Sequence, residues 1–324
     1  MHTSPPRPAS RLTAALEQGP VILDGAMGTE LEARGVDTSH ELWSALALIE
    51  QPQAVSAVHA DYLRAGAQVI TTDSYQASLP AFMRAGLSEA RARAALAASA
   101  RLALEAREAH AAAGGGRALV AGSVGPYGAY LADGSEYTGD YRLDPAGWAA
   151  FHTPRLEILL EEGVEALAVE TMPRLDEAQA IMALIIRIAG GPDAAPPVWV
   201  SFQVRPDGLR LADGTPLGRA GAWADEHEGL VAIGVNCVTP GAVLPALGAL
   251  APVTSKPLVA CPNSGEAYHP GARTWTASRG RQRPTDLAPR WIRAGARLVG
   301  GCCRTTPADT AALVEALALV QPPR

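Results

Sequence analysis

Two adjacent cysteines near the carboxyl end of the sequence carry its clearest chemical signal. Cys302 and Cys303 lie in the run 300–306, which opens with two glycines that let the backbone come close to a bound group. Adjacent cysteines do not pair easily with each other. Two neighbouring thiolates can instead face one cation, as soft ligands suited to Zn²⁺. The pair therefore predicts part of a metal site.

A third thiolate comes from Cys237, which follows an apolar run far upstream of Cys302. If both runs are strands of one parallel barrel, their carboxyl ends lie on the same rim. Three thiolates with an exchangeable fourth ligand are typical of a catalytic zinc rather than a closed structural one. Cys261 ends another run near this rim. It is interpreted as an ordinary buried cysteine, and whether it approaches the metal is left open.

Polar groups follow several other apolar runs. Asp24 precedes Gly25, Ala26 and Met27, where a carboxylate suits an amino group but equally suits a helix N-cap. Glu170 directly follows an apolar run, and a carboxylate there is rarely unpaired, so we expect a bound cation or amine. An aromatic face is offered by Tyr75, and further tyrosines gather in one later stretch: Tyr127, Tyr130, Tyr137 and Tyr141.

Eight short apolar runs must position these residues, and each is bounded by turn residues. They alternate with Ala- and Leu-rich helical segments, which is typical of a (β/α)8 TIM-type barrel in the α/β class. The expected strands are Val21–Leu23, Gln68–Thr72, Ala118–Ala121, Ala166–Val169, Val198–Val204, Val231–Val235, Leu258–Ala260 and Arg297–Val299.

The segments between these runs predict helices and two long rim loops. Helices are expected over Arg91–Ala113, Leu175–Ile188 and Val243–Leu250, where Pro245 is tolerable only in the first turn. A last helix begins after Thr306, with Pro307 and Asp309 in its first turn. The long loops follow strands 3 and 7, over Gly125–Asp144 and Pro262–Pro284, and the first is expected to act as a lid.

Composition narrows the class of protein. The 324 residues include 33 acidic and 27 basic side chains, a net charge of −6, and 48% are hydrophobic. These values exclude disorder and argue against nucleic acid or an anionic membrane as partner. Four cysteines are too few for a disulfide framework, so we expect a reducing compartment, the cytoplasm. A flexible tail is expected over residues 1–18 and one barrel domain over 19–322.

Together these motifs resemble those of the zinc-dependent homocysteine S-methyltransferase family. The segment Tyr127–Tyr137 is similar to the branch that uses S-methylmethionine, more than to the branch that uses betaine. The matching stretches follow the whole chain in order: Asp24–Thr29, Thr72–Gln76, Gly122–Gly139, Glu170–Pro173, Gly234–Cys237, Pro262–Glu266 and Gly300–Pro307.

The resemblance implies a role for each candidate residue. Zn²⁺ would be held by Cys237, Cys302 and Cys303, with the homocysteine sulfur in the open position. Asp24 and Glu170 would hold the amino group of homocysteine. The remaining substrate-binding residues would be Gly25, Ala26 and Met27 near its carboxylate, Tyr75 beside the methyl donor, and Asn236.

The implied reaction moves a methyl group from a sulfonium donor, S-methylmethionine or S-adenosylmethionine, to the homocysteine thiolate and forms methionine. Two other readings stay open: a homocysteine module fed by betaine, methylfolate or cobalamin, and a non-catalytic zinc- or thiol-binding barrel. We expect no obligate protein partner. The preferred donor, selenocysteine as an acceptor and the oligomeric state are not fixed by the sequence.

Overall fold

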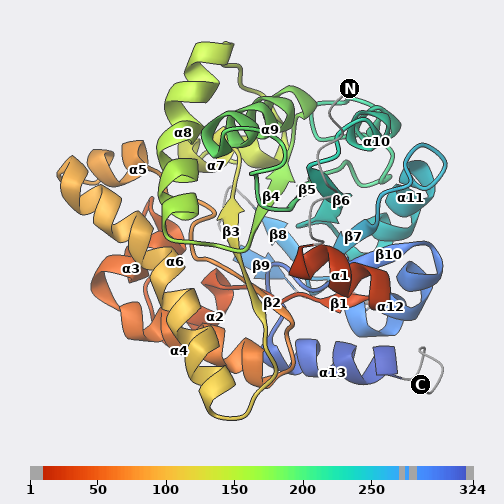
Figure 1. Ribbon diagram of the computed structural model, residues 1–324, viewed down its shortest axis with the longest axis horizontal. Coiled ribbons are helices and arrows are strands. Elements are labelled where there is room, and N and C mark those ends of the chain that lie inside the picture. Colours follow the sequence, from red (N-terminus) through yellow and green to blue (C-terminus); the bar gives the residue numbers. More distant parts are fainter. Residues whose placement is uncertain (1–9, 270–273, 277–282, 319–324) are drawn as a thin grey trace.

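Eight parallel strands form a nearly closed barrel inside a ring of helices (Figure 1). The computed structural model describes residues 10–269, 274–276 and 283–318. The strands follow the order β1-β10-β7-β6-β5-β4-β3-β2, and a parallel bridge between Leu23 and Val69 joins the two ends of that row. The predicted (β/α)8 barrel is therefore confirmed.

Each of the eight predicted strands is present, with ends shifted by a few residues. Their side chains are almost all buried, because helices cover the outside of the barrel and side chains fill its inside. The barrel strands are β1 (Val21–Ile22), β2 (Val69–Thr71), β3 (Leu119–Val124), β4 (Ala166–Met172), β5 (Val198–Phe202), β6 (Leu230–Asn236), β7 (Leu258–Cys261) and β10 (Ala296–Val299).

Helices follow the strands and pack apolar faces against them. They are α1 (Arg11–Gln18), α2 (Gly28–Ala33), α3 (Ala47–Glu50), α4 (Pro52–Arg64), α5 (Leu79–Arg84), α6 (Glu89–Ala112), α7 (Tyr127–Leu131), α8 (Pro145–Glu161), α9 (Leu175–Ala189), α10 (Leu217–Asp225), α11 (Pro240–Leu250), α12 (Pro284–Arg293) and α13 (Pro307–Ala318), with 3₁₀ turns η1 (Trp43–Leu46) and η2 (Ser135–Tyr137).

The amino-terminal segment differs from the prediction. A flexible tail was expected over residues 1–18, but α1 forms over Arg11–Gln18 and buries Leu12 and Leu16 against the barrel interior. Arg11 also bonds Glu165 and the carbonyl oxygen of Arg117, which precede β4 and β3. The helix therefore covers the amino end of the barrel, opposite the rim that carries the chemistry. Residues 1–9 lie outside the described part.

Both long rim loops contain secondary structure. The segment after β3 holds α7 and η2, and the one after β7 holds an antiparallel pair, β8 (Ala267–His269) and β9 (Thr274–Thr276). The helix predicted from residue 243 begins earlier, at Pro240, so Pro245 lies inside α11 rather than in a first turn. The predicted cap of α13 is confirmed, because Thr306 and Asp309 bond each other's backbone N–H groups.

No helix in the described ranges is both long and apolar enough to cross a membrane.

Candidate metal and substrate site

A cavity of about 720 Å³ opens at the carboxyl ends of the barrel strands. Its wall includes every residue that the sequence nominated for metal or substrate binding: Asp24, Gly25, Ala26, Met27, Tyr75, Glu170, Asn236, Cys237, Cys302 and Cys303. Its volume lies within the range of small-molecule sites. The barrel thus brings residues that are far apart in sequence into one chamber.

Three sulfur atoms form a cluster in this wall. The Sγ atoms of Cys237, Cys302 and Cys303 all lie within 4.8 Å of one another, and those of Cys237 and Cys303 are 3.7 Å apart. Zinc–sulfur bonds of about 2.3 Å at tetrahedral angles place sulfurs about 3.8 Å apart. The cluster therefore fits a single thiophilic ion. Cys261 also lines the cavity but does not belong to the cluster.

Unusual backbone conformations gather around this cluster. Cys237 has φ of 54°, Thr171 has φ of 57° and Arg304, directly after Cys303, has φ of 66°. Residues other than glycine seldom adopt such left-handed values, and each costs about 1–3 kcal/mol. The surrounding hydrogen bonds hold them: the Cys237 N–H donates to the carbonyl oxygen of Cys261. These strained conformations turn the backbone that carries the clustered cysteines toward the cavity.

Asp24 and Glu170 are the two carboxylates beside the cysteines. The Oδ2 atom of Asp24 accepts from the N–H of Thr71 at 2.7 Å, and Glu170 accepts from the Ser123 hydroxyl. Burial raises the pKa of Asp24 to about 8 and that of Glu170 to about 7, and these hydrogen bonds oppose the rise. Two buried carboxyls with raised pKa values and no basic partner among the described residues are suited to a ligand ammonium group.

Asn236 contributes to the site through its neighbours. Its side-chain oxygen accepts from the Thr171 N–H at 2.7 Å and the Ser201 hydroxyl at 2.9 Å. Its amide nitrogen donates to the Thr171 hydroxyl at 2.8 Å and to Glu170 at 3.3 Å. All its hydrogen-bonding capacity is used within the protein. Asn236 therefore fixes the strained Thr171 and the Glu170 carboxylate.

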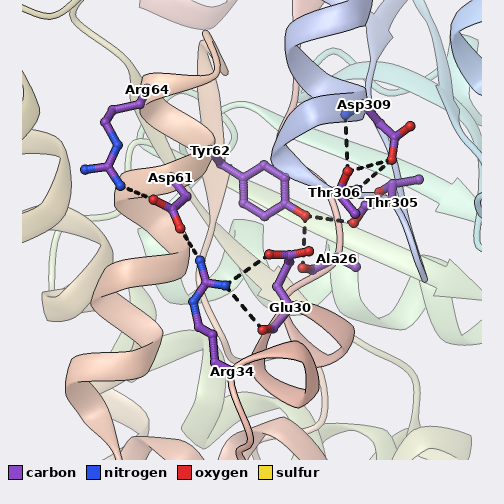
Figure 2. A network of polar contacts seen from close by, with 9 residues as sticks. All are labelled: Ala26, Glu30, Arg34, Asp61, Tyr62, Arg64, Thr305, Thr306 and Asp309. Carbon is purple, nitrogen blue, oxygen red and sulfur yellow. Dashed lines mark hydrogen bonds and ion pairs between the residues drawn. The ribbon is translucent and has the colours of Figure 1, made fainter.

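Tyr62 is a positioning residue that the sequence did not single out. Its hydroxyl, in α4, lies 3.0 Å from the carbonyl oxygens of both Ala26 and Thr305 (Figure 2). A side chain at Gly25 has no room, because a Cβ there would lie 2.5 Å from Thr305 Oγ1. The rim segments after β1 and β10 are therefore joined. Nothing in the local sequence marks an interior helix tyrosine for this role.

Polar contacts around Tyr62 brace the same corner of the barrel. Arg34 bonds Glu30 within α2 and Asp61 on α4, and Asp61 also pairs with Arg64 (Figure 2). Tyr62 itself is buried, so its link between the two rim segments is shielded from water. The chain segment 24–29 is thereby held against α4 and the start of α13.

Tyr75 and Tyr137 face the cysteines, whereas the other tyrosines of the segment after β3 do not. Tyr75 and Tyr137 line the cavity, and the Tyr137 hydroxyl lies 3.8 Å from Cys237 Sγ. The pKa of Tyr75 is raised well above its usual value by burial and then by the charge of Glu136. The remaining loop tyrosines pack with Trp148 and Phe151 in an aromatic cluster outside the cavity: Tyr127, Tyr130 and Tyr141.

A buried ionic network anchors the loop after β3. Glu177, on α9, accepts from the Tyr127 N–H at 2.6 Å and from the Tyr141 hydroxyl at 2.5 Å. Its Oε1 also lies 3.0 Å from His152 Nε2. Arg155 donates to the carbonyl oxygens of Tyr75 and Gly125. These bonds anchor both ends of the segment that was expected to act as a lid, at Gly125–Tyr127 and at Tyr141.

The charged side chains of the cavity wall are predominantly acidic. Within the described part of the chain, no arginine or lysine lines it. Its carboxyl-bearing residues are Asp24, Glu32, Asp37, Glu41, Asp73, Asp133, Glu136 and Glu170. Such a wall attracts cationic ligands and repels anionic ones.

The chain as a whole is similar to proteins of a known family. A family model described as homocysteine S-methyltransferase matches residues 21–317. The chain is 48% identical to Homocysteine S-methyltransferase of Escherichia coli (92% of this chain, 95% of the relative) and 43% identical to YbgG of Bacillus subtilis (89% and 91%). The metallated form of E. coli MmuM superposes with a TM-score of 0.83 at 46% identity, covering 93% of this chain and 98% of that one.

Proposed function

Because the chain belongs to the homocysteine S-methyltransferase family and so methylates homocysteine to form methionine, we propose that its donor is a small sulfonium compound and its metal is Zn²⁺. The observation that carries the donor proposal is the acidic cavity wall without arginine or lysine among its described residues. S-methylmethionine and S-adenosylmethionine each carry two positive groups, a sulfonium and an ammonium, and one negative carboxylate, so their net charge is positive. Betaine has no net charge and methylfolate is an anion, so this wall favours them less.

The metal proposal rests on the donor set. Three thiolates are soft ligands, and their sulfur spacing fits a tetrahedral zinc site with one position left for a substrate. Zn²⁺ bound there supplies a Lewis acid that lowers the pKa of the homocysteine thiol, so that sulfur is a thiolate at neutral pH. Reduced cysteines of this kind agree with a cytoplasmic location.

The residues of this chain bind and orient the acceptor. Asp24 and Glu170 hold the homocysteine ammonium between them, and the backbone of Gly25–Met27 lies beside its carboxylate. Asn236 keeps Glu170 in place through the bond to its Oε2 atom. The ammonium also compensates the two buried carboxylates, which lose their protons when it binds.

Tyr75 and Tyr137 present aromatic rings to the positive sulfur of the donor, and each such contact stabilises a cation by about 0.5–2 kcal/mol. In the transfer, the homocysteine sulfur forms a new bond to the methyl carbon as the bond from that carbon to the donor sulfur breaks. The electron pair of the broken bond stays on the donor sulfur, which becomes a neutral thioether. The thiol proton of homocysteine is released to solvent, so atoms and charges balance.

A donor panel tests the proposal. Purified enzyme is incubated with homocysteine and S-methylmethionine, S-adenosylmethionine, betaine or methylfolate, and methionine is measured. We expect rapid methionine formation with a sulfonium and little with betaine or methylfolate. Faster turnover with betaine or methylfolate would overturn the sulfonium proposal.

Zinc X-ray absorption of the same enzyme tests the metal proposal. We expect three sulfur ligands in the resting enzyme and four when homocysteine is added. A spectrum that homocysteine leaves unchanged, or a stoichiometric metal other than zinc, contradicts it.

A further inference from the structure

Asp73 is a buried carboxylate that neither the metal nor the homocysteine group uses. It follows β2, is 3% exposed and lines the cavity. Its Oδ1 accepts from the Ser44 hydroxyl at 2.6 Å, whereas its Oδ2 has no hydrogen-bond partner among the described residues. Burial raises the pKa of Asp73 to about 6, against the bond from Ser44. An unpartnered carboxylate oxygen in such a place costs free energy until a cation reaches it.

Asp73 is separate from the pair that we assign to homocysteine. Asp24 is bonded by Thr71, and Glu170 by Ser123 and Asn236. Asp73 has a different partner, Ser44, which comes from the η1 turn. Asp73 is therefore an acidic position of the cavity wall that is anchored separately from the Asp24–Glu170 pair.

The chemistry of the two substrates supplies a reason for two positions. Homocysteine and S-methylmethionine are both α-amino acids, so each brings one ammonium group into the chamber. We propose that Asp73, oriented by Ser44, binds the α-ammonium group of the methyl donor and thereby selects sulfonium compounds that are amino acids. This inference rests on the sulfonium donor proposed above and names the residue that recognises it.

Glu136 is the alternative within the same wall, because in the part of the chain that the structure describes its Oε2 also has no hydrogen-bond partner. It directly precedes Tyr137, whose hydroxyl lies 3.8 Å from Cys237 Sγ, so Glu136 lies on the part of the wall next to the cysteines. That position suits the sulfonium centre, where the methyl group leaves, rather than the distant amino end of the donor. Asp73 is therefore assigned to the ammonium group.

Two donors that differ only in the amino group test this assignment. S-methylmethionine is compared with dimethylsulfoniobutanoate, the same molecule without its ammonium, using the metal-loaded wild type and Asp73→Asn. The substitution keeps the shape and the bond from Ser44 but removes the charge. We expect KM for S-methylmethionine to rise about 10- to 100-fold, the cost of one charged hydrogen bond, with KM for the deaminated donor and for homocysteine unchanged.

Two further variants make the result decisive. Asp133→Asn removes the same charge from the cavity wall, but this carboxylate already accepts from the Ser135 N–H at 2.9 Å. It should affect both donors equally. Glu136→Gln tests the alternative position. Equal effects of Asp73→Asn on both donors, or a selective effect of Glu136→Gln instead, overturn the assignment. If wild type uses neither sulfonium, the donor proposal itself has failed.

Discussion

Substitution of Cys302 should abolish the reaction and leave the stability of the fold nearly unchanged. Cys302 provides one of three clustered sulfurs and stands at the rim, outside the packed interior. We expect Cys302→Ala to abolish methionine formation and to weaken metal binding by more than about 100-fold. Loss of a residue that only hydrogen-bonds a metal ligand already weakens binding by about 10- to 100-fold, and loss of the ligand itself should cost more. The free energy of unfolding of the metal-free protein should change by less than about 1 kcal/mol. Metal analysis and urea unfolding measure the two effects.

Cys261 provides the matched control for that experiment. It lines the same cavity and lies opposite Asn236 in the β6–β7 register, but it is outside the sulfur cluster. Cys261→Ala should therefore keep both the metal and the activity. Loss of the metal from this variant, or full activity of Cys302→Ala, contradicts the ligand assignment.

Glu170 should matter for the substrate and not for the ion. Its carboxylate is bonded by Ser123 and Asn236, and it faces the cavity beside the cysteines. Glu170→Gln should raise KM for homocysteine about 10- to 100-fold, because a charged hydrogen bond to the ammonium is lost. Metal affinity should stay close to that of the wild type. If metal content and homocysteine binding fall together, Glu170 is a structural residue.

Asp24 predicts a pH dependence of stability in the protein without substrate. Burial raises its pKa to about 8, above the usual value of 3.8. The folded state therefore binds a proton that the unfolded state has lost, so stability falls as the pH rises from about 4 to 8. Asp24→Asn should reduce the loss of unfolding free energy between pH 5 and pH 8 by about 1–3 kcal/mol. Urea unfolding at both pH values measures it, and an unchanged difference contradicts the buried-carboxyl interpretation.

At the residue scale, sequence reasoning reached the groups whose type alone suggests chemistry. Adjacent cysteines and carboxylates at strand ends can be recognised from residue type and position in the sequence alone. Tyr62, Asp73 and Ser44 did not, because each acquires its role from a partner far away in the chain. The bond from Tyr62 to Thr305 spans 243 positions, and no local pattern encodes it.

Among the elements, the loop after β3 depends on a network behind it. The Glu177 carboxylate hydrogen-bonds with three residues: Tyr127, Tyr141 and His152. It also compensates the positive charge of the buried Arg155. Glu177→Gln leaves that arginine uncompensated, so the free energy of unfolding should fall by about 3–5 kcal/mol. Arg101 and Glu162 form a surface ion pair, and Glu162→Gln, the control, should cost less than about 1 kcal/mol. Urea unfolding compares them, and equal costs contradict a buried ionic anchor.

Continuous apolar runs predicted the strands well, whereas the helices at the amino terminus and around Pro245 were predicted less well. Eight buried runs between turn residues are a strong signal, and all eight are strands. The helix α1 was missed because its eight residues follow a proline-rich start and its stability comes from Leu12 and Leu16 packing on the barrel. Pro245 was misplaced for the opposite reason. Tertiary contacts let α11 continue through a residue that removes one helical hydrogen bond.

For the molecule as a whole, we expect the barrel to stay folded when the metal ion is removed. The interior and the helix-facing core are built from apolar side chains, and none of the three clustered cysteines belongs to either. Removing the ion with a chelator should abolish activity and leave the far-UV circular dichroism spectrum unchanged. The melting temperature should fall, because an ion that binds only the folded state stabilises it by mass action. Re-adding zinc should restore both; collapse of the spectrum would show that the ion is structural.

The bonds of Tyr62 to Ala26 and Thr305 have a consequence for how the active protein is made. They join the first and last units of the barrel beside the proposed metal site, whose cysteines directly follow β6 and lie in the turn after β10. A chain that is still being synthesised cannot assemble that site until its final unit has left the ribosome. If these cysteines hold the ion as proposed, we expect metal binding to follow closure of the barrel, and an ion bound with full affinity to report that closure.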